Sequence, residues 1–257
     1  MREIKLNLGA QLYTLREYCK TAEDFADTMR KVAGIGYRRV QVSGVGAEVT
    51  PAVIKKSADE TGLKVMLTHT NPGRILSDTD AVIEEHKLIG CNAIGIGSCP
   101  FGATIDGFNR LINEYAPAVE KIKAAGMIFL YHNHRMEFEK YENEFFLDIL
   151  LKGTDPDAVK LTFDTYWAVS GGIDPAKYIR EHGDRIFCTH LKDMRVVKDE
   201  TRMTEMLTGN MNFDSIMEAC AETGVLWHFV EQDNVYMDAF ESMKISNDNL
   251  KARFAMI

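Results

Sequence analysis

The sequence predicts an α/β protein folded as a single (β/α)8 barrel of the TIM-barrel class, one domain spanning residues 1–257. Three observations support this prediction. The length of 257 residues matches the roughly 250 residues that such a barrel needs. Short apolar runs alternate with amphipathic segments along the whole chain. The runs recur at intervals of roughly 30 residues, the length of a βαβ unit.

The apolar runs are expected to form the buried parallel strands of the barrel. They are rich in β-branched and aromatic residues and show little alternation, as strands covered on both faces do. The runs span residues 4–13, 38–45, 64–70, 93–99, 127–134, 159–167, 185–193 and 227–233.

The segments between the runs carry helix start and stop signals. Residues 21–36 begin with the capping residue Thr21, place Phe25 and Met29 on one face, and end at Gly36. Residues 50–62 repeat the pattern of a threonine, a proline and a closing glycine. The same signals predict helices at residues 77–90, 107–126, 142–153, 174–184, 212–224 and 238–254.

A doubly wound open sheet is the main alternative to a barrel. Such a sheet normally carries a G-x-G-x-x-G turn after its first strand. Here the first run continues into AQLYTLREY. The near-equal units that fill the whole length favour closure into a barrel.

Composition excludes several classes of partner. The chain has 30 Lys and Arg against 38 Asp and Glu, so its net charge is −8 and no nucleic-acid partner is expected. No apolar stretch reaches the length of a membrane span, and the amino-terminal residues MREIKLNLGAQLY lack the apolar core of a signal peptide. The 5 cysteines include no C-x-x-C pair. We therefore expect a cytoplasmic protein with reduced thiols.

Candidate functional residues are found where the apolar runs end. Active sites of (β/α)8 barrels lie at the carboxyl ends of the strands. Polar and aromatic side chains crowd these positions, most densely after the last four runs: Gln11, His69, His132, His134, Glu137, Asp164, Trp167, His190, Lys192 and Glu231.

Four of these residues predict a metal site. Glu137, Asp164, His190 and Glu231 each follow a different strand and would converge on the barrel axis. Three carboxylates that close repel one another unless a cation lies among them. A donor set of oxygens with one nitrogen suits Mn²⁺, our first expectation, with Mg²⁺, Co²⁺, Zn²⁺ and Fe²⁺ left open. Each residue taken alone is also compatible with a helix cap or a rim charge.

The remaining rim residues are candidates for substrate contacts. His132 and His134 are two apart on one strand, so both should face the same side. Lys192 follows His190 by two and should also point inward. His69 and Trp167 have a packing role as the alternative. We expect substrate binding from Gln11, His69, His134, Trp167 and Lys192.

Four segments resemble the sugar phosphate isomerase/epimerase superfamily, whose members are xylose isomerase-like TIM barrels. They are YHNHRMEF (131–138), LTFDTYWAVSGG (161–172), THLKDM (189–194) and FVEQDN (229–234), and the resemblance extends over essentially the whole chain. HLKD and VEQD at the ends of the last two strands are the most specific part of it.

The resemblance implies a divalent metal held by Glu, Asp, His and Glu. Asp164, His190 and Glu231 match this pattern directly. Glu137 matches the first glutamate in the branch that carries a Y-H-N-H motif, with Glu139 and Glu142 as neighbouring alternatives.

The function predicted from these residues is a metal-dependent isomerase or epimerase of a small sugar or keto-sugar. Glu137 and Glu231 would move a proton alpha to a carbonyl through an enediolate, assisted by His132 and Lys192. The alternative is a lyase or dehydratase of a keto-sugar, inosose or keto-glycoside that uses the same site. A sugar-binding relic and a nuclease are further readings. The sequence leaves open whether the substrate is phosphorylated and whether the chain forms a homo-oligomer.

Overall fold

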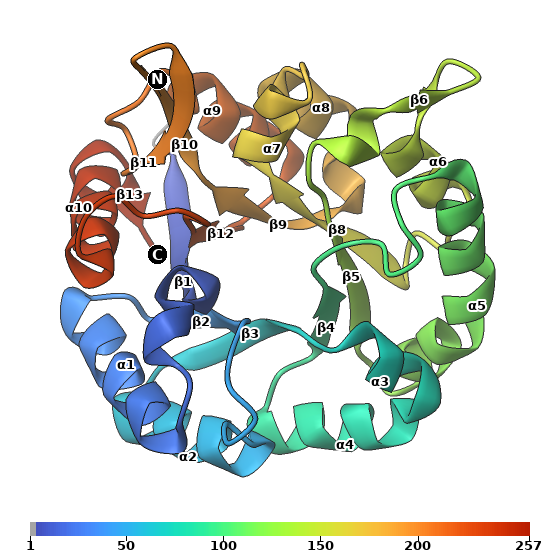
Figure 1. Cartoon of the computed structure of the whole chain (residues 1–257), viewed down its shortest axis with the longest axis horizontal. Coiled ribbons are helices and arrows are strands. Elements are labelled where there is room, and N and C mark those ends of the chain that lie inside the picture. The colour runs from blue at the N-terminus through green and yellow to red at the C-terminus, as the bar shows by residue number, and fades with distance from the viewer. Residues whose placement is uncertain (1–3) are drawn as a thin grey trace.

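A computed structural model describes residues 4–257 and contains a closed parallel barrel (Figure 1). Its nine-stranded sheet closes because β12 pairs with β1, and the short β13 (Ala255–Met256) adds to the start of β1, which leaves eight strands in the barrel. The predicted fold class is confirmed. The barrel strands are β1 (Lys5–Gln11), β2 (Arg39–Val42), β3 (Lys64–His69), β4 (Ala93–Ile96), β5 (Ile128–His132), β8 (Val159–Asp164), β9 (Ile186–Leu191) and β12 (Trp227–Val230).

The principal helices surround the strands on the outside (Figure 1). Within residues 4–257 no helix combines the length and the apolar character needed to cross a membrane. These helices are α1 (Ala22–Ile35), α2 (Pro51–Thr61), α4 (Thr79–Ile89), α5 (Ile105–Ala124), α6 (Phe146–Lys152), α8 (Pro175–His182), α9 (Phe213–Thr223) and α10 (Ala239–Arg253).

The predicted capping signals act as expected at α1. The Thr21 hydroxyl accepts a hydrogen bond from the Asp24 amide at 3.1 Å, and Gly36 closes the helix with φ of 108°. This left-handed conformation strains any residue with a Cβ, so glycine is the natural stop.

The strands alternate between an outer core under the helices and a small inner core on the barrel axis. Leu67, Ala93, Leu130, Cys188 and Phe229 form the inner cluster. Two residues further along β3, β5, β9 and β12, the same inward face carries polar side chains, because a strand side chain repeats its direction every second residue. The inner apolar cluster therefore forms the floor beneath a polar layer.

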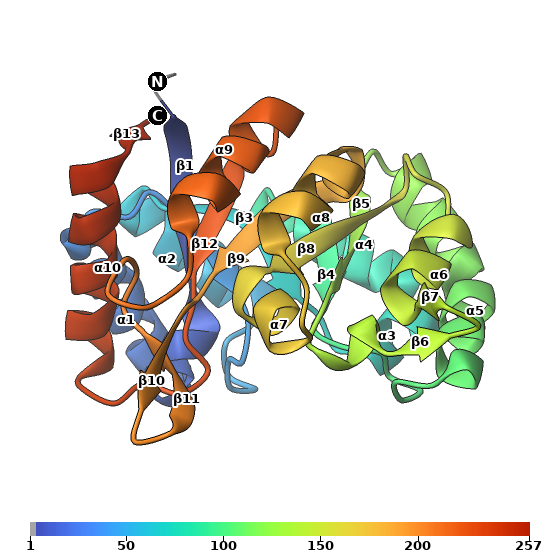
Figure 2. The ribbon, with the colours of Figure 1, turned by 90° about the horizontal axis from the view of Figure 1, so that it is seen from above.

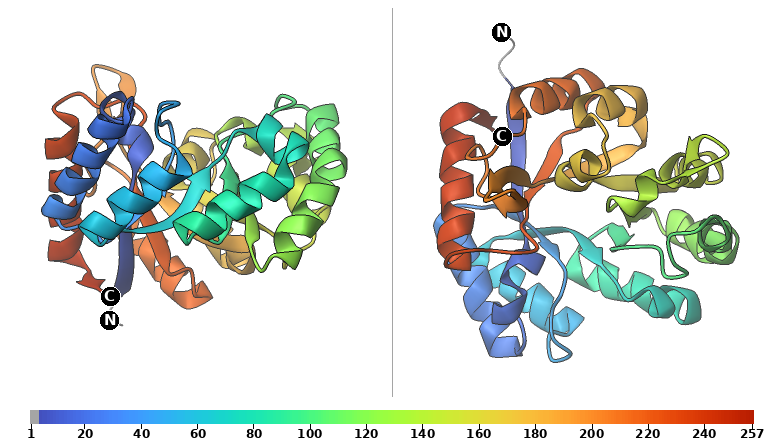
Figure 3. Two further views of the ribbon diagram at one scale, coloured as in Figure 1. Left: turned by 90° about the horizontal axis from the view of Figure 1, so that it is seen from below. Right: turned by 45° about the horizontal axis from the view of Figure 1, so that its top comes forward.

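The polar layer lies at the end of the barrel opposite the chain termini. Figures 2 and 3 show the termini together at one end and the hairpin of β10 (Asp193–Val197) and β11 (Glu200–Thr204) at the other. The loop after this hairpin is fixed by the Asp193 carboxylate, which accepts hydrogen bonds from the amides of Gly209 at 2.9 Å and Met211 at 3.3 Å.

Most predicted strands and helices differ from the structure by a few residues at their ends, and two of these differences have a visible cause. The run 159–167 stops as a strand at Asp164, because the Asp164 carboxylate accepts the Trp167 amide at 2.9 Å and starts helix α7 (Thr165–Ser170). The helix predicted at 142–153 begins only at Phe146. Before it, β6 (Lys140–Tyr141) and β7 (Glu144–Phe145) form a hairpin with left-handed residues at its turn.

Further short elements join the strands to the helices. They are the 3-10 helices η1 (Leu12–Tyr18), η2 (Met136–Phe138) and η3 (Gly183–Arg185), and helix α3 (Pro72–Ser77).

Candidate metal centre and substrate pocket

Four strand ends bring a buried group of two histidines and two carboxylates together. Asp164 and His190 are direct register partners on β8 and β9. His132 ends β5, and Glu231 follows β12. One potential ligand atom from each of these residues lies within 4.8 Å of all the others, and all four residues are buried. We call this group the four-residue cluster.

The distances within the cluster are short. Glu231 Oε2 lies 2.7 Å from His190 Nδ1. Asp164 Oδ2 lies 3.2 Å from His132 Nε2 and 3.6 Å from His190 Nδ1. Two carboxylates and two imidazoles out of contact with water are stable only if protons or a cation lie between them.

Hydrogen bonds on the side away from the cluster orient the imidazoles of His132 and His190. The Gly97 carbonyl lies 3.1 Å from His132 Nδ1, so this nitrogen carries the proton and Nε2 faces the cluster. Gln41 Oε1 lies 2.6 Å from His190 Nε2, which leaves Nδ1 facing the cluster. Histidines that ligate metals commonly donate their other ring nitrogen to such an acceptor.

The orientation and donor chemistry of these residues fit a divalent cation. His190 Nδ1 and Glu231 Oε2 are buried and find no well-aligned hydrogen-bond partner among residues 4–257. Carboxylate oxygens and imidazole nitrogens are together the donors that first-row divalent metals accept. The cluster is thus a possible metal-binding group of His, Asp, His and Glu.

Lys192 adds a buried ammonium beside the cluster. Its Nζ lies 2.9 Å from carboxylate oxygens of Asp164, Glu231 and Asp233. Burial opposes the charged form, but these three carboxylates outweigh it and raise the Lys192 pKa. The ammonium therefore stays protonated at neutral pH.

The charges on the carboxylates follow from the same contacts. Burial raises the pKa of Glu231, but the positive charges of Lys192 and His190 outweigh burial, so the net shift is downward. Burial and Glu231 raise the pKa of Asp233. Glu231 is therefore fully ionised at neutral pH, whereas Asp233 takes up a proton more readily.

The structure does not bring Glu137 into the cluster, although the sequence predicted it there. Its Oε1 accepts a hydrogen bond from the Tyr131 hydroxyl at 2.7 Å, and its Oε2 accepts the His134 amide at 2.8 Å. Tyr131 alternates with His132 on β5 and packs on Phe108 in the outer core. The glutamate is thereby drawn away from the axis, and His132 takes the place that was predicted for it.

A polar cavity of ≈ 480 Å³ opens over the cluster. This volume lies within the range of small-molecule sites. Of the five predicted substrate-binding residues, His69 and His134 line it directly. The lining residues are Tyr13, Ser43, His69, Thr70, Asn71, Pro72, Gly97, Ser98, His132, His134, Glu231 and Asp233.

The other predicted substrate-binding residues lie behind or beside this lining. The Trp167 ring packs 5.3 Å from that of His134, and the Lys192 ammonium lies 5.7 Å from the Trp167 ring. Gln11 is fully buried at the end of β1, where its Oε1 accepts the Tyr13 amide at 3.1 Å.

His69 and His134 in the lining are neutral. Burial lowers the pKa of His69 well below its usual value and that of His134 to about 3. His69 Nδ1 bonds to the Ser43 hydroxyl at 3.1 Å. His69 Nε2 and His134 Nδ1 are buried, and the described part of the chain gives them no partner.

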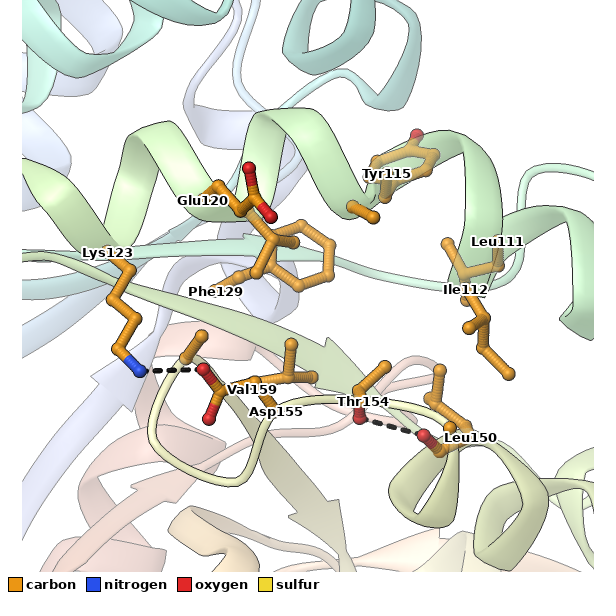
Figure 4. Close-up of a pocket in the computed structure, with 14 residues that line it drawn as sticks. Leu111, Ile112, Tyr115, Glu120, Lys123, Phe129, Leu150, Thr154, Asp155 and Val159 are labelled. Carbon is orange, nitrogen blue, oxygen red and sulfur yellow. Dashed lines mark hydrogen bonds and ion pairs between the residues drawn. The ribbon is translucent and has the colours of Figure 1, made fainter.

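A second cavity on the outer face of the barrel is unrelated to this chemistry. It measures ≈ 160 Å³ and lies between α5 and the connection from α6 to β8 (Figure 4). Apolar side chains line most of it, and its charged lining residues include the ion pair of Lys123 with Asp155 at 2.6 Å. The larger polar cavity is therefore the candidate site.

The fold agrees with a comparison against known families. A family model described as the xylose isomerase-like TIM barrel matches residues 29–246. This chain belongs to the xylose isomerase-like TIM barrel family. The family resemblance predicted from the sequence is thus confirmed.

Several similar proteins are enzymes by name. An inosose dehydratase of Lacticaseibacillus casei is 30% identical over 156 residues, which are 54% of this chain and 52% of that protein. The chain thus spans about half the length of the curated relatives it matches. A sugar phosphate isomerase/epimerase from Parabacteroides distasonis is 28% identical with a TM-score of 0.79, covering 95% of this chain and 97% of that one. A second such structure from that organism has 25% identity and a TM-score of 0.79 over 98% and 95% of the two chains.

Sequence reasoning missed Gln41 and gave Asp233 no role. Gln41 interrupts the apolar run 38–45 between Val40 and Val42, both buried. A lone amide at an inward-facing strand position was the available signal. Asp233 follows Glu231 by two residues and shares its side of the chain, as its contact with Lys192 shows.

Proposed function

We propose that this chain is a divalent-metal-dependent enzyme that removes a proton alpha to the carbonyl of a small sugar or keto-sugar, as an isomerase or epimerase does. The observation that carries the proposal is the buried four-residue cluster at the floor of a polar cavity. The similarity to an isomerase/epimerase at 28% identity and to inosose dehydratases at 30% supports the same reaction class.

His132, Asp164, His190 and Glu231 would hold the metal. When bound, a divalent cation supplies Lewis acidity that makes the hydrogen alpha to a carbonyl more acidic. The two imidazoles of this set favour Mn²⁺, Co²⁺, Zn²⁺ or Fe²⁺ over Mg²⁺. Mn²⁺ remains our first expectation.

Glu231 is the proposed base. Its carboxylate is ionised at neutral pH because Lys192 and His190 hold its pKa down, and the residue lines the cavity. Lys192 is the proposed positioning partner, since its ammonium lies 2.9 Å from Glu231 and keeps that carboxylate charged. His69 and His134 are neutral donors that would orient substrate hydroxyls.

The position of Glu137 bears on the outcome of the reaction. Epimerisation by a pair of glutamates would need Glu137 opposite Glu231, but Glu137 is engaged by Tyr131 and His134. Isomerisation through an enediolate needs only one base, which removes the proton and returns it to the neighbouring carbon. Among the isomerase and epimerase reactions, we therefore favour isomerisation with Glu231 as the single base.

A dehydratase is the second candidate, and the buried four-residue cluster at the floor of the cavity supports it as well. Glu231 would remove the alpha proton and pass it to the hydroxyl on the beta carbon, which leaves as water. The carbon–hydrogen and carbon–oxygen bonds break while the carbon–carbon double bond forms. The inosose dehydratase relatives support this reading.

Proton NMR in D₂O with metal-loaded protein and a panel of keto-sugars and inososes separates the two outcomes. An isomerase gives an isomeric product with solvent deuterium at the carbon that receives the proton. A dehydratase gives loss of water. Glu231→Gln is expected to slow either reaction by at least about a hundredfold. Turnover that survives this substitution, or no exchange and no turnover across the panel in the wild type, would contradict the proposal.

A further inference from the structure

The cavity above the cluster carries no excess positive charge. Asp164, Glu231 and Asp233 surround Lys192, so three carboxylates face one ammonium. Among the described residues that line the cavity, none is a lysine or an arginine.

The positive groups near the cavity are already engaged. The Lys192 side chain is fully buried and contacts three carboxylates at 2.9 Å. Arg16 reaches the rim, but its terminal nitrogens donate to the carbonyls of Tyr13 and Asp233, each at 3.0 Å. Three carboxylates thus surround Lys192, and Arg16 is not among the described residues that line the cavity.

The helix that begins at the cavity wall offers no anion site either. Pro72 opens α3 and has no amide hydrogen, and the Asn71 side chain accepts the Arg74 amide at 3.2 Å. Anion binding at a helix start needs free amides. The described lining therefore holds no lysine or arginine, and the first turn of α3 offers no amide at Pro72 and an engaged one at Arg74.

The groups that the cavity does present suit neutral oxygens. Ser43, Thr70 and Ser98 supply hydroxyls to the lining, and the rings of His69 and His134 each keep a buried nitrogen without a partner among residues 4–257. Neutral donors and acceptors recognise hydroxyl and carbonyl oxygens without a charge to balance.

We infer that the substrate is an uncharged polyhydroxy ketone, with neither a phosphate nor a carboxylate group. The inference rests on the proposed function and narrows it, because several relatives are named for sugar phosphates. Placing a phosphate dianion beside Glu231 and Asp233 would bring like charges together at low dielectric, and we expect at least about a tenfold loss of affinity for the phosphate ester of a ligand.

Paired ligands test the inference by isothermal titration calorimetry on the wild-type chain with and without added Mn²⁺. The pairs are D-fructose with D-fructose 6-phosphate and D-tagatose with D-tagatose 6-phosphate. We expect saturable binding of the neutral sugars and dissociation constants about tenfold or more higher for their phosphate esters. This difference in affinity should shrink as the salt concentration rises. An ester that binds as tightly as its parent overturns the inference and leaves the proposed function standing. Binding of neither member of any pair overturns both.

A charge-insertion variant separates charge from size. Ser98 is exposed within the lining. Ser98→Lys therefore adds an ammonium there and should reduce the difference in affinity between sugar and ester by about tenfold. Leu226→Lys adds the same charge just before β12, at the other end of the barrel, and should leave this difference unchanged. An unchanged difference in Ser98→Lys would mean that the ester is rejected by shape, which contradicts the inference.

Discussion

Replacing Gln41 should weaken metal binding although its side chain is outside the four-residue cluster. Gln41 Oε1 lies 2.6 Å from His190 Nε2, and both residues are fully buried. With a metal bound, His190 Nδ1 must carry no proton so that it can bind the metal, and the ring proton must be on Nε2. In Gln41→Leu that buried N–H has no acceptor, whereas without metal the ring is free to turn or to move its proton.

The magnitude follows from this difference between the two states. An unsatisfied buried donor costs about 1–3 kcal/mol. Because the cost arises mainly in the metal-bound state, the metal dissociation constant should rise by about 10- to 100-fold. Titration of the chelator-stripped protein with Mn²⁺ and Zn²⁺ in a calorimeter measures it.

Two further variants make this prediction specific. Gln41→Glu keeps an acceptor for the His190 N–H and should bind metal at least as well as the wild type. Gln232→Leu removes another buried amide, which donates to the Ser242 hydroxyl at 2.7 Å outside the cluster, and should leave the dissociation constant within about twofold. Wild-type affinity in Gln41→Leu, or a loss in Gln41→Glu equal to that in Gln41→Leu, would refute the reasoning.

The remaining predictions concern Glu137 and His228. Glu137→Gln should leave the metal dissociation constant within about twofold. It should lower the free energy of unfolding by about 1–3 kcal/mol, because the buried Tyr131 hydroxyl and His134 amide lose a charged acceptor. A large loss of metal affinity in calorimetry would show that Glu137 is a ligand after all. Burial lowers the pKa of His228 to about 3, so the unfolded chain takes up a proton there that the folded chain refuses. This stability is present above pH 6.5 and is lost as the pH falls toward 3, by about 1.4 kcal/mol per unit. In urea titrations of metal-free protein, His228→Gln should flatten the pH dependence by that slope, and an unchanged slope would contradict the assignment.

The fold could be predicted from the sequence because its signals are local and repeated. Apolar runs, capping residues and closing glycines recur at an even spacing, and closure of the barrel follows from their number. Two predicted boundaries were wrong where a local turn or cap overrides the wider pattern. Asp164 ends β8 because its carboxylate caps α7, and the turn at Glu142 and Asn143 replaces a helical start with a hairpin.

The site was predictable only in part. Asp164, His190 and Glu231 meet as the strand ends required. Glu137 lies within η2, where the Tyr131 hydroxyl decides the direction of its side chain, and a linear sequence does not reveal that contact. The role of the Gln41 amide could not be predicted, because its partner, His190, lies on β9 across the barrel. The cytoplasmic location and a homo-oligomeric state stay predictions.

Anomalous diffraction from crystals of the chain grown with Mn²⁺ tests the central claim most directly. The account predicts one strong peak within coordination distance of His132 Nε2, Asp164 Oδ2, His190 Nδ1 and Glu231 Oε2, and its loss in crystals of Asp164→Ala. A peak bound to Glu137 in place of His132, or no peak at the cluster, would contradict it.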